Sequence, residues 1–153
     1  MAEDPAGTSL TWDEVARRLA RPANYWLGTT GDDGAPRAVP MWGVVLDNLF
    51  YLYAERRSVK ARHMAAEPRV VVHPESAEDV LIVRGTVDDL GPPGRAPAVV
   101  AAFAEKYPAE DDAPYLPSAE RFDVLYALRP TNAITWLIED PEGTTRRWRV
   151  DAP

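Results

Sequence analysis

Residues 49–64 of this chain read LFYLYAERRSVKARHM and contain its clearest change of predicted secondary structure. Aromatic and aliphatic residues fill positions 49–54, a composition that favours a β-strand. Ser58 then offers a side-chain oxygen that can cap a helix over residues 58–66, and Pro68 marks the end of that helix. The stretch therefore predicts a strand that leads through a short cationic turn into a helix.

The cationic turn is a candidate phosphate site. Residues 56–64 hold four Lys or Arg side chains, although the formal net charge of the chain is −7. The start of a helix attracts anions because its first backbone N–H groups lack partners and the helix dipole is positive there. We therefore expect Ser58 and Lys60, helped by Arg57, to bind a phosphate group. The alternative is a solvated helix face whose charges balance nearby carboxylates.

The rest of the sequence predicts a mainly β chain with short helices. Thr11 and Glu14 have the spacing of a capping box, which predicts a helix within an N-terminal segment of residues 1–22. Further strands are expected at residues 25–30, 36–45, 69–73, 80–87, 122–128, 133–138 and 146–150, with a helix at 97–107 and a surface loop at 108–120. Short strands at close spacing indicate one antiparallel barrel of six to eight strands over residues 1–153.

Composition argues against several classes of protein. The absence of cysteine excludes disulfides and thiolate metal sites, and two isolated histidines argue against any metal site. A pI near 4.8 argues against general nucleic-acid binding. No apolar run reaches the roughly 18 residues of a membrane helix, and the N-terminus lacks the pattern of a signal peptide. We expect a cytoplasmic protein that binds neither nucleic acid nor membrane.

The order of these segments resembles the pyridoxamine 5′-phosphate oxidase-like split-barrel family. The resemblance rests on GAPRAVPMWGVV at 34–45, on the stretch at 49–64, and on RVVVH and DVLIVRGTV at 69–73 and 79–87. The closing TTRRWRV at 144–150 is similar to actinobacterial members that use FMN or the deazaflavin coenzyme F-420. The resemblance implies a split barrel, a homodimer with cofactor at the subunit interface, and an oxidoreductase that acts on a small-molecule substrate.

The resemblance also implies roles for individual residues. The strand at 37–42 would lie along the cofactor ring, residues 53 and 54 would flank the ribityl chain, and residues 148 and 149 would reach the partner subunit's cofactor. The implied cofactor-binding residues are Arg37, Val39, Pro40, Met41, Trp42, Tyr53, Ala54, Arg57, Ser58, Lys60, Trp148 and Arg149. No catalytic side chain is expected, because hydride transfer is chemistry of the cofactor.

Several alternatives stay open at this level. The cofactor is either coenzyme F-420 or FMN; the actinobacterial resemblance favours the former, whose long anionic tail would suit a path along Arg56, Arg57, Lys60 and Arg62. A protein of the same fold could instead bind flavin, haem or another tetrapyrrole without turnover. A third possibility is a small-ligand barrel unrelated to flavins, in which Trp42 and Tyr53 belong to the core and the basic cluster is surface.

Overall fold

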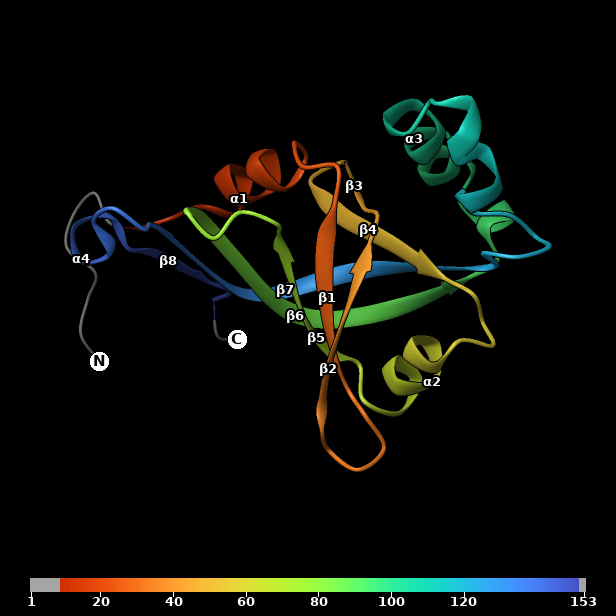
Figure 1. Ribbon diagram of the computed structural model, residues 1–153, viewed down its shortest axis with the longest axis horizontal. Coiled ribbons are helices and arrows are strands. Elements are labelled where there is room, and N and C mark those ends of the chain that lie inside the picture. Colours follow the sequence, from red (N-terminus) through yellow and green to blue (C-terminus); the bar gives the residue numbers. More distant parts are fainter. Residues whose placement is uncertain (1–8, 152–153) are drawn as a thin grey trace.

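The structure is a computed structural model that describes residues 9–151 (Figure 1). The helices are α1 (Trp12–Leu19), α2 (Val59–Ala66), α3 (Pro97–Lys106) and α4 (Pro141–Thr144), with 3₁₀ helices η1 (Pro93–Arg95) and η2 (Glu110–Tyr115). The strands are β1 (Tyr25–Thr30), β2 (Pro36–Met41), β3 (Val44–Leu46), β4 (Leu49–Ala54), β5 (Arg69–Pro74), β6 (Asp79–Gly91), β7 (Val124–Leu137) and β8 (Arg146–Arg149). The predicted mainly β composition is confirmed.

All eight strands form one antiparallel sheet in the order β2-β1-β5-β6-β7-β4-β3, and β8 pairs with β7 outside that path. The sheet curls on itself, so that β1 and β2 cross in front of β6 and β7 in Figure 1. Tyr25 of β1 and Phe50 of β4 meet inside the curl with ring centroids 5.0 Å apart, although three strands separate β1 from β4 in the sheet. This curled antiparallel sheet agrees with the predicted split barrel.

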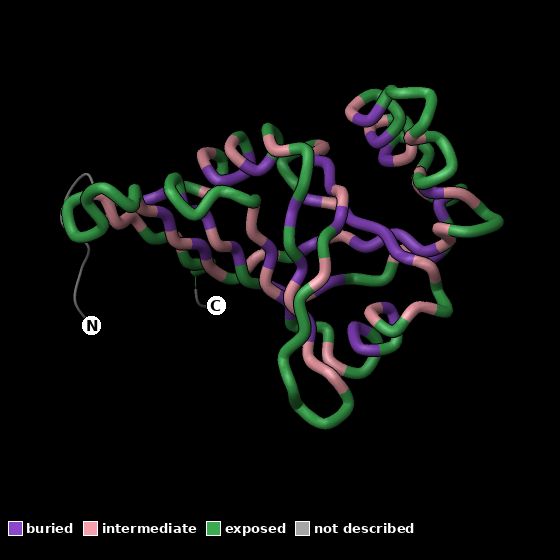
Figure 2. The backbone as a smooth tube through the Cα atoms, viewed as in Figure 1, coloured by how far each residue is buried: buried purple, intermediate pink, exposed green. Residues whose placement is uncertain are grey.

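The core follows the alternation of side chains along each strand (Figure 2). In β1, Tyr25, Leu27 and Thr29 point inward and are buried. Fully buried side chains of the other strands complete the core; they include Phe50, Leu52, Val72, Val83, Val124 and Leu128. A second cluster surrounds Phe103 of α3, which packs on Tyr53 of β4. The sheet therefore buries one face of its central strands, and α3 packs at the side that carries β3 and β4.

Two predicted strand boundaries were wrong. Residues 36–45 form two strands, because the chain breaks at Trp42 and Gly43 before β3 turns to pair with β4. A Cβ atom on Gly43 would overlap the buried ring of Phe50. The backbone at the break therefore lies closer to Phe50 than a residue with a side chain would permit. Pro40 lies on β2, which is an edge strand, as its missing N–H predicts.

Conversely, the strands predicted at 122–128 and 133–138 are one strand, β7. The register of β6 and β7 shifts between Arg84 and Gly85, so Thr131 is left over on β7 as a bulge. The hydroxyl of Thr131 donates to the carbonyl of Arg84 at 3.1 Å. β7 therefore continues through Pro130, and its register with β6 changes at the bulge beside it.

The segment predicted as a surface loop at 108–120 also differs in part. It contains η2, whose residues are mostly exposed, as expected for a polar connection. Tyr107, immediately before it, is 5% exposed and belongs to the core under α3.

The capping box of α1 gives a direct test of local stability. The Thr11 hydroxyl accepts from the Glu14 N–H at 3.2 Å, and the Glu14 carboxylate accepts from the Thr11 N–H at 3.3 Å. We expect Thr11→Ala to lower the free energy of unfolding by about 1 kcal/mol, because a helix donor then loses its acceptor. Urea unfolding of this variant beside Arg17→Ala, exposed on the same helix, measures the effect. Equal midpoints for the two variants would contradict it.

Candidate functional site

A cavity of about 280 Å³ opens where β2 ends, beside β4 and α2. We call it the aromatic pocket; it is lined by Asn24, Pro40, Met41, Trp42, Tyr53, Lys60, Tyr115 and Phe122. Five of these were implied as cofactor-binding residues by the family resemblance: Pro40, Met41, Trp42, Tyr53 and Lys60. Segments distant in sequence thus bring one cation and four aromatic rings to a single cavity.

Lys60 lies in the first turn of α2 and faces this pocket. Ser58 is the N-cap, and its hydroxyl oxygen accepts from the Ala61 N–H at 3.3 Å. The N–H groups of Val59 and Lys60 have no acceptor inside the helix. The Lys60 side chain is half-buried, and this burial lowers the pKa of its ammonium group. The helix start therefore combines a half-buried cation with free backbone donors.

The other cations of the cluster do not form the open basic path expected from the sequence. Arg56 forms a two-pronged ion pair with Asp89 of β6. The Arg62 guanidinium lies 3.3 Å from the Asp32 carboxylate, and the Arg57 Nε lies 3.2 Å from the Glu55 carboxylate. Each of these carboxylates offsets the positive charge of its partner. Within residues 9–151 no ion pair involves Lys60, so this residue supplies the site's cation.

One wall of the pocket comes from the end of η2 and the segment that follows it, through Tyr115 and Phe122. The Tyr53 hydroxyl donates to the backbone carbonyl of Tyr115, and burial raises the pKa of Tyr53 above its ordinary value. The Arg121 guanidinium lies 4.9 Å from the centre of the Phe122 ring and pairs with Glu55 at 3.1 Å. These contacts fasten the wall to β4.

Trp42 forms the opposite wall and contacts residues of α3. Its indole stacks on Tyr107 with centroids 4.2 Å apart and planes 7° apart. Its Nε1 donates to the Asn24 side-chain oxygen at 3.2 Å. Lys106, next to Tyr107, donates to the Gly43 carbonyl at 2.7 Å and to the Tyr25 hydroxyl at 2.8 Å.

Lys106 predicts a measurable pH dependence of stability. Burial lowers its pKa to about 8, whereas an unfolded lysine titrates near 10.4. From about pH 8 to 9.5 the unfolded chain binds more protons than the folded one, so the free energy of unfolding should rise with pH. Above this window tyrosines of the unfolded chain ionise before the buried ones, which opposes the rise. Urea titrations at several pH values should show a smaller rise for Lys106→Met; parallel curves would contradict the assignment.

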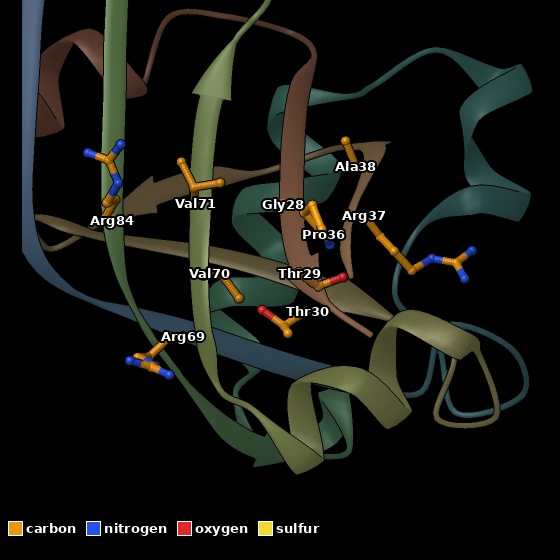
Figure 3. Close-up of a pocket in the computed structure, with 10 residues that line it drawn as sticks. All are labelled: Gly28, Thr29, Thr30, Pro36, Arg37, Ala38, Arg69, Val70, Val71 and Arg84. Carbon is orange, nitrogen blue, oxygen red and sulfur yellow. The ribbon is translucent and has the colours of Figure 1, made fainter. Parts of the chain in front are cut away.

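A second, larger cavity of about 460 Å³ lies on the outer face of the sheet. We call it the arginine groove; it is lined by Gly28, Thr29, Thr30, Pro36, Arg37, Ala38, Arg69, Val70, Val71 and Arg84. Figure 3 shows Gly28, Ala38 and Val71 toward its middle, with the guanidinium groups of Arg37, Arg69 and Arg84 spread around it. Arg37 therefore lies in a different cavity from Trp42, although both were predicted to contact one cofactor ring.

The remaining predicted residues lie outside the aromatic pocket. Val39 packs against the main core, and Ala54 is fully buried. The Arg57 side chain is 86% exposed. Trp148 and Arg149 belong to β8, at the opposite end of the sheet from α2 (Figure 1), where Trp148 packs on Trp12. Within one chain these two residues are far from Lys60.

Sequence reasoning missed three residues that line the pocket: Asn24, Tyr115 and Phe122. All three lie outside regular strands, so periodicity gives no signal for them. The part of the chain that the structure describes contains no cluster of His, Cys, Asp or Glu suited to a metal ion. Nor does any helix among residues 9–151 have the length and apolar character needed to cross a membrane.

Comparison with known proteins agrees with this fold. A sequence model of the family described as pyridoxamine 5′-phosphate oxidase matches residues 11–136. No curated protein sequence matches the chain. A solved structure described as an F420 reductase is 26% identical, with a TM-score of 0.61, over 75% of this chain and 91% of that chain.

Two mycobacterial structures share the fold. A conserved hypothetical protein from Mycobacterium tuberculosis is 19% identical with a TM-score of 0.68, over 89% of this chain and 90% of that chain. A heme binding protein from Mycobacterium smegmatis is 18% identical with a TM-score of 0.70, over 92% of this chain and 58% of that chain. At these identities the likeness establishes the fold alone.

Proposed function

This chain belongs to the pyridoxamine 5′-phosphate oxidase family, and from that premise we propose that it is a flavin- or deazaflavin-dependent oxidoreductase that transfers hydride to or from a small conjugated substrate. The observation that carries the proposal is the aromatic pocket, where Lys60 faces the rings of Trp42 and Tyr53. A phosphate and a flat ring are the two chemical features that FMN and coenzyme F-420 share.

The residues of the pocket suit such a group. The half-buried Lys60 and the free N–H groups at the start of α2 would bind the phosphate, with the Ser58 hydroxyl beside them. Trp42 and Tyr53 offer an apolar surface for a ring system, and Pro40 and Met41 continue that surface along β2. When bound, the cofactor supplies hydride transfer. This chain would bind it, orient its ring and exclude water from one face.

We further propose that the protein acts as a homodimer. The aromatic pocket, at about 280 Å³, lies just below the usual 300–1,000 Å³ range of ligand sites, so one chain would enclose only part of such a cofactor. A partner subunit would supply the remaining surface and would bring its Trp148 and Arg149 close to the cofactor, which neither does within one chain. Sedimentation at micromolar concentration tests this assembly.

Cofactor choice is the finer part of the proposal, and we favour coenzyme F-420. The similarity to a structure described as an F420 reductase supports it. One observation weighs the other way: Arg56 and Arg62 pair with carboxylates, so less of the basic path that the sequence offered for the long anionic tail of coenzyme F-420 is available. Haem is less favoured, because neither of the two histidines lines the aromatic pocket.

Equilibrium dialysis of the purified protein against FMN and against coenzyme F-420 tests the proposal. Micromolar binding of one of them is expected, and binding of neither would overturn the oxidoreductase assignment. Tighter binding of FMN would overturn our choice between the two. Reduced cofactor with a quinone acceptor then separates the classes: turnover indicates an enzyme, and binding without turnover indicates a carrier.

A further inference from the structure

The break between β2 and β3 leaves Gly43 outside the strand pairing of the sheet. A buried backbone N–H or C=O without a partner is costly, so both groups of this buried residue need partners elsewhere. The Gly43 carbonyl accepts from Lys106 Nζ at 2.7 Å, and the Gly43 N–H donates to the Tyr107 hydroxyl oxygen at 3.2 Å. Two consecutive side chains at the end of α3 thus take the place of a neighbouring strand.

Tyr107 also fixes the side chain that precedes Gly43. Tyr107 stacks face to face on Trp42 at 4.2 Å, and its hydroxyl donates to the Ala23 carbonyl at 2.7 Å. Asn24, next to Ala23, accepts from the Trp42 indole at 3.2 Å. Trp42 is therefore held at its ring face by Tyr107 and at its indole nitrogen by Asn24. Tyr107 in turn binds Ala23, the neighbour of Asn24.

We propose that Lys106 and Tyr107 are positioning residues that clamp the β2–β3 break and so hold Trp42 in place as a wall of the aromatic pocket. Neither of them lines the pocket, so their effect on a ligand would pass through Trp42 and Gly43. The part of the inference that concerns cofactor affinity rests on the proposed function. α3 would then be the element that sets how tightly the pocket holds a flat ring.

The physical reason is preorganisation. A half-buried indole that is free to change rotamer must be ordered when a ligand binds against it, and that ordering reduces affinity. An indole already fixed by stacking and by a hydrogen bond avoids this loss. Lys106 and Tyr107 therefore improve binding without contacting the ligand, and they leave the phosphate contacts of Lys60 unchanged.

The position of Trp42 can be observed without any cofactor. The chain has five tryptophans, so its ¹⁵N spectrum should show five indole N–H signals, and loss of one signal in Trp42→Phe assigns that of Trp42. In Tyr107→Leu we expect the Trp42 signal to shift while the other four stay, because the stacked ring is gone. Lys106→Met should move the same signal. Tyr126→Leu removes a buried tyrosine of β7 that does not line the pocket, and it should leave the Trp42 signal in place.

Binding completes the test. We expect Tyr107→Leu to raise the dissociation constant of FMN or coenzyme F-420 about 3- to 10-fold, and Tyr126→Leu to change it less than 2-fold. An unmoved Trp42 signal in Tyr107→Leu, or equal losses of affinity in the two leucine variants, would overturn the clamp. If Tyr107→Leu does not fold, Tyr107→Phe decides: it keeps the ring but loses the hydroxyl contacts, and an unchanged signal with unchanged affinity would overturn the clamp equally.

The two proposals fail in different ways. If the wild-type protein binds neither cofactor, the proposed function fails, and the Trp42 signal of the unliganded variants still decides whether Tyr107 positions the indole. If the wild-type protein binds but Tyr107→Leu binds as tightly, the function stands and the clamp fails.

Discussion

Lys60→Ala should weaken cofactor binding by about 1.5–3 kcal/mol, or about 10- to 150-fold in dissociation constant. The ammonium group is the cation that lines the aromatic pocket; it is half-buried and forms no ion pair within residues 9–151, although the negative charge of Glu55 acts on it. A charge-assisted hydrogen bond to a phosphate gains strength in such surroundings. Equilibrium dialysis or fluorescence quenching with FMN and coenzyme F-420 measures the loss.

The same substitution should leave the unliganded protein almost as stable as the wild type. Burial disfavours the charged form of Lys60, so removal of the ammonium group relieves a cost in the absence of ligand. Lys60→Arg retains the charge and should recover part of the affinity. Arg17→Ala, at an exposed position of α1, controls for loss of one positive charge from the whole chain. Equal affinity of Lys60→Ala and Arg17→Ala would remove Lys60 from the binding site.

Local sequence signals predicted the elements that local chemistry determines. The strand at 49–54, the Ser58 cap and the capping box of α1 all match the structure, because each depends on neighbours within a few residues. Asp47 and Asn48 form the turn between β3 and β4 with positive φ angles of 49° and 68°, which these residue types tolerate. The helix start around Lys60 was predicted correctly for the same reason.

Features that depend on contacts between residues far apart in the sequence were not predicted. Asp89 neutralises Arg56 from 33 residues away, and Tyr115 reaches the pocket from a segment that reads as a polar loop. Tyr107 acts on Trp42 from 65 residues further along the chain, since 107 − 42 = 65. The hydrophobic pattern and the spacing of residues in the sequence do not indicate which distant side chains come into contact. The predicted site therefore contained its cation and one aromatic wall, and it lacked the second wall and the contacts that hold the first.

Gly85→Ala should destabilise the fold by about 3 kcal/mol or more, at the high end of overpacking. A Cβ atom on Gly85 would overlap the carbonyl oxygen of Arg129 and lie 2.9 Å from the Cα atom of Pro130. Both are backbone atoms of β7, which pairs with β6 along its length, so no side-chain rotation relieves the overlap. Gly94→Ala is the matched control, because a Cβ there meets nothing within 4 Å. Urea unfolding measures both variants, and equal midpoints would contradict the prediction.

The bulge beside Gly85 also determines where β8 lies. β7 pairs with β4 through residues 124–128 and with β8 through residues 132–135, and the bulge at Thr131 separates the two partners. If the bulge were lost, the register of β7 beyond it would slip by one residue and turn its side chains to the opposite face. We therefore expect any folded fraction of Gly85→Ala to change the environment of Trp148, which near-ultraviolet circular dichroism detects. An unchanged spectrum in Gly85→Ala would show that β8 holds its place without the bulge.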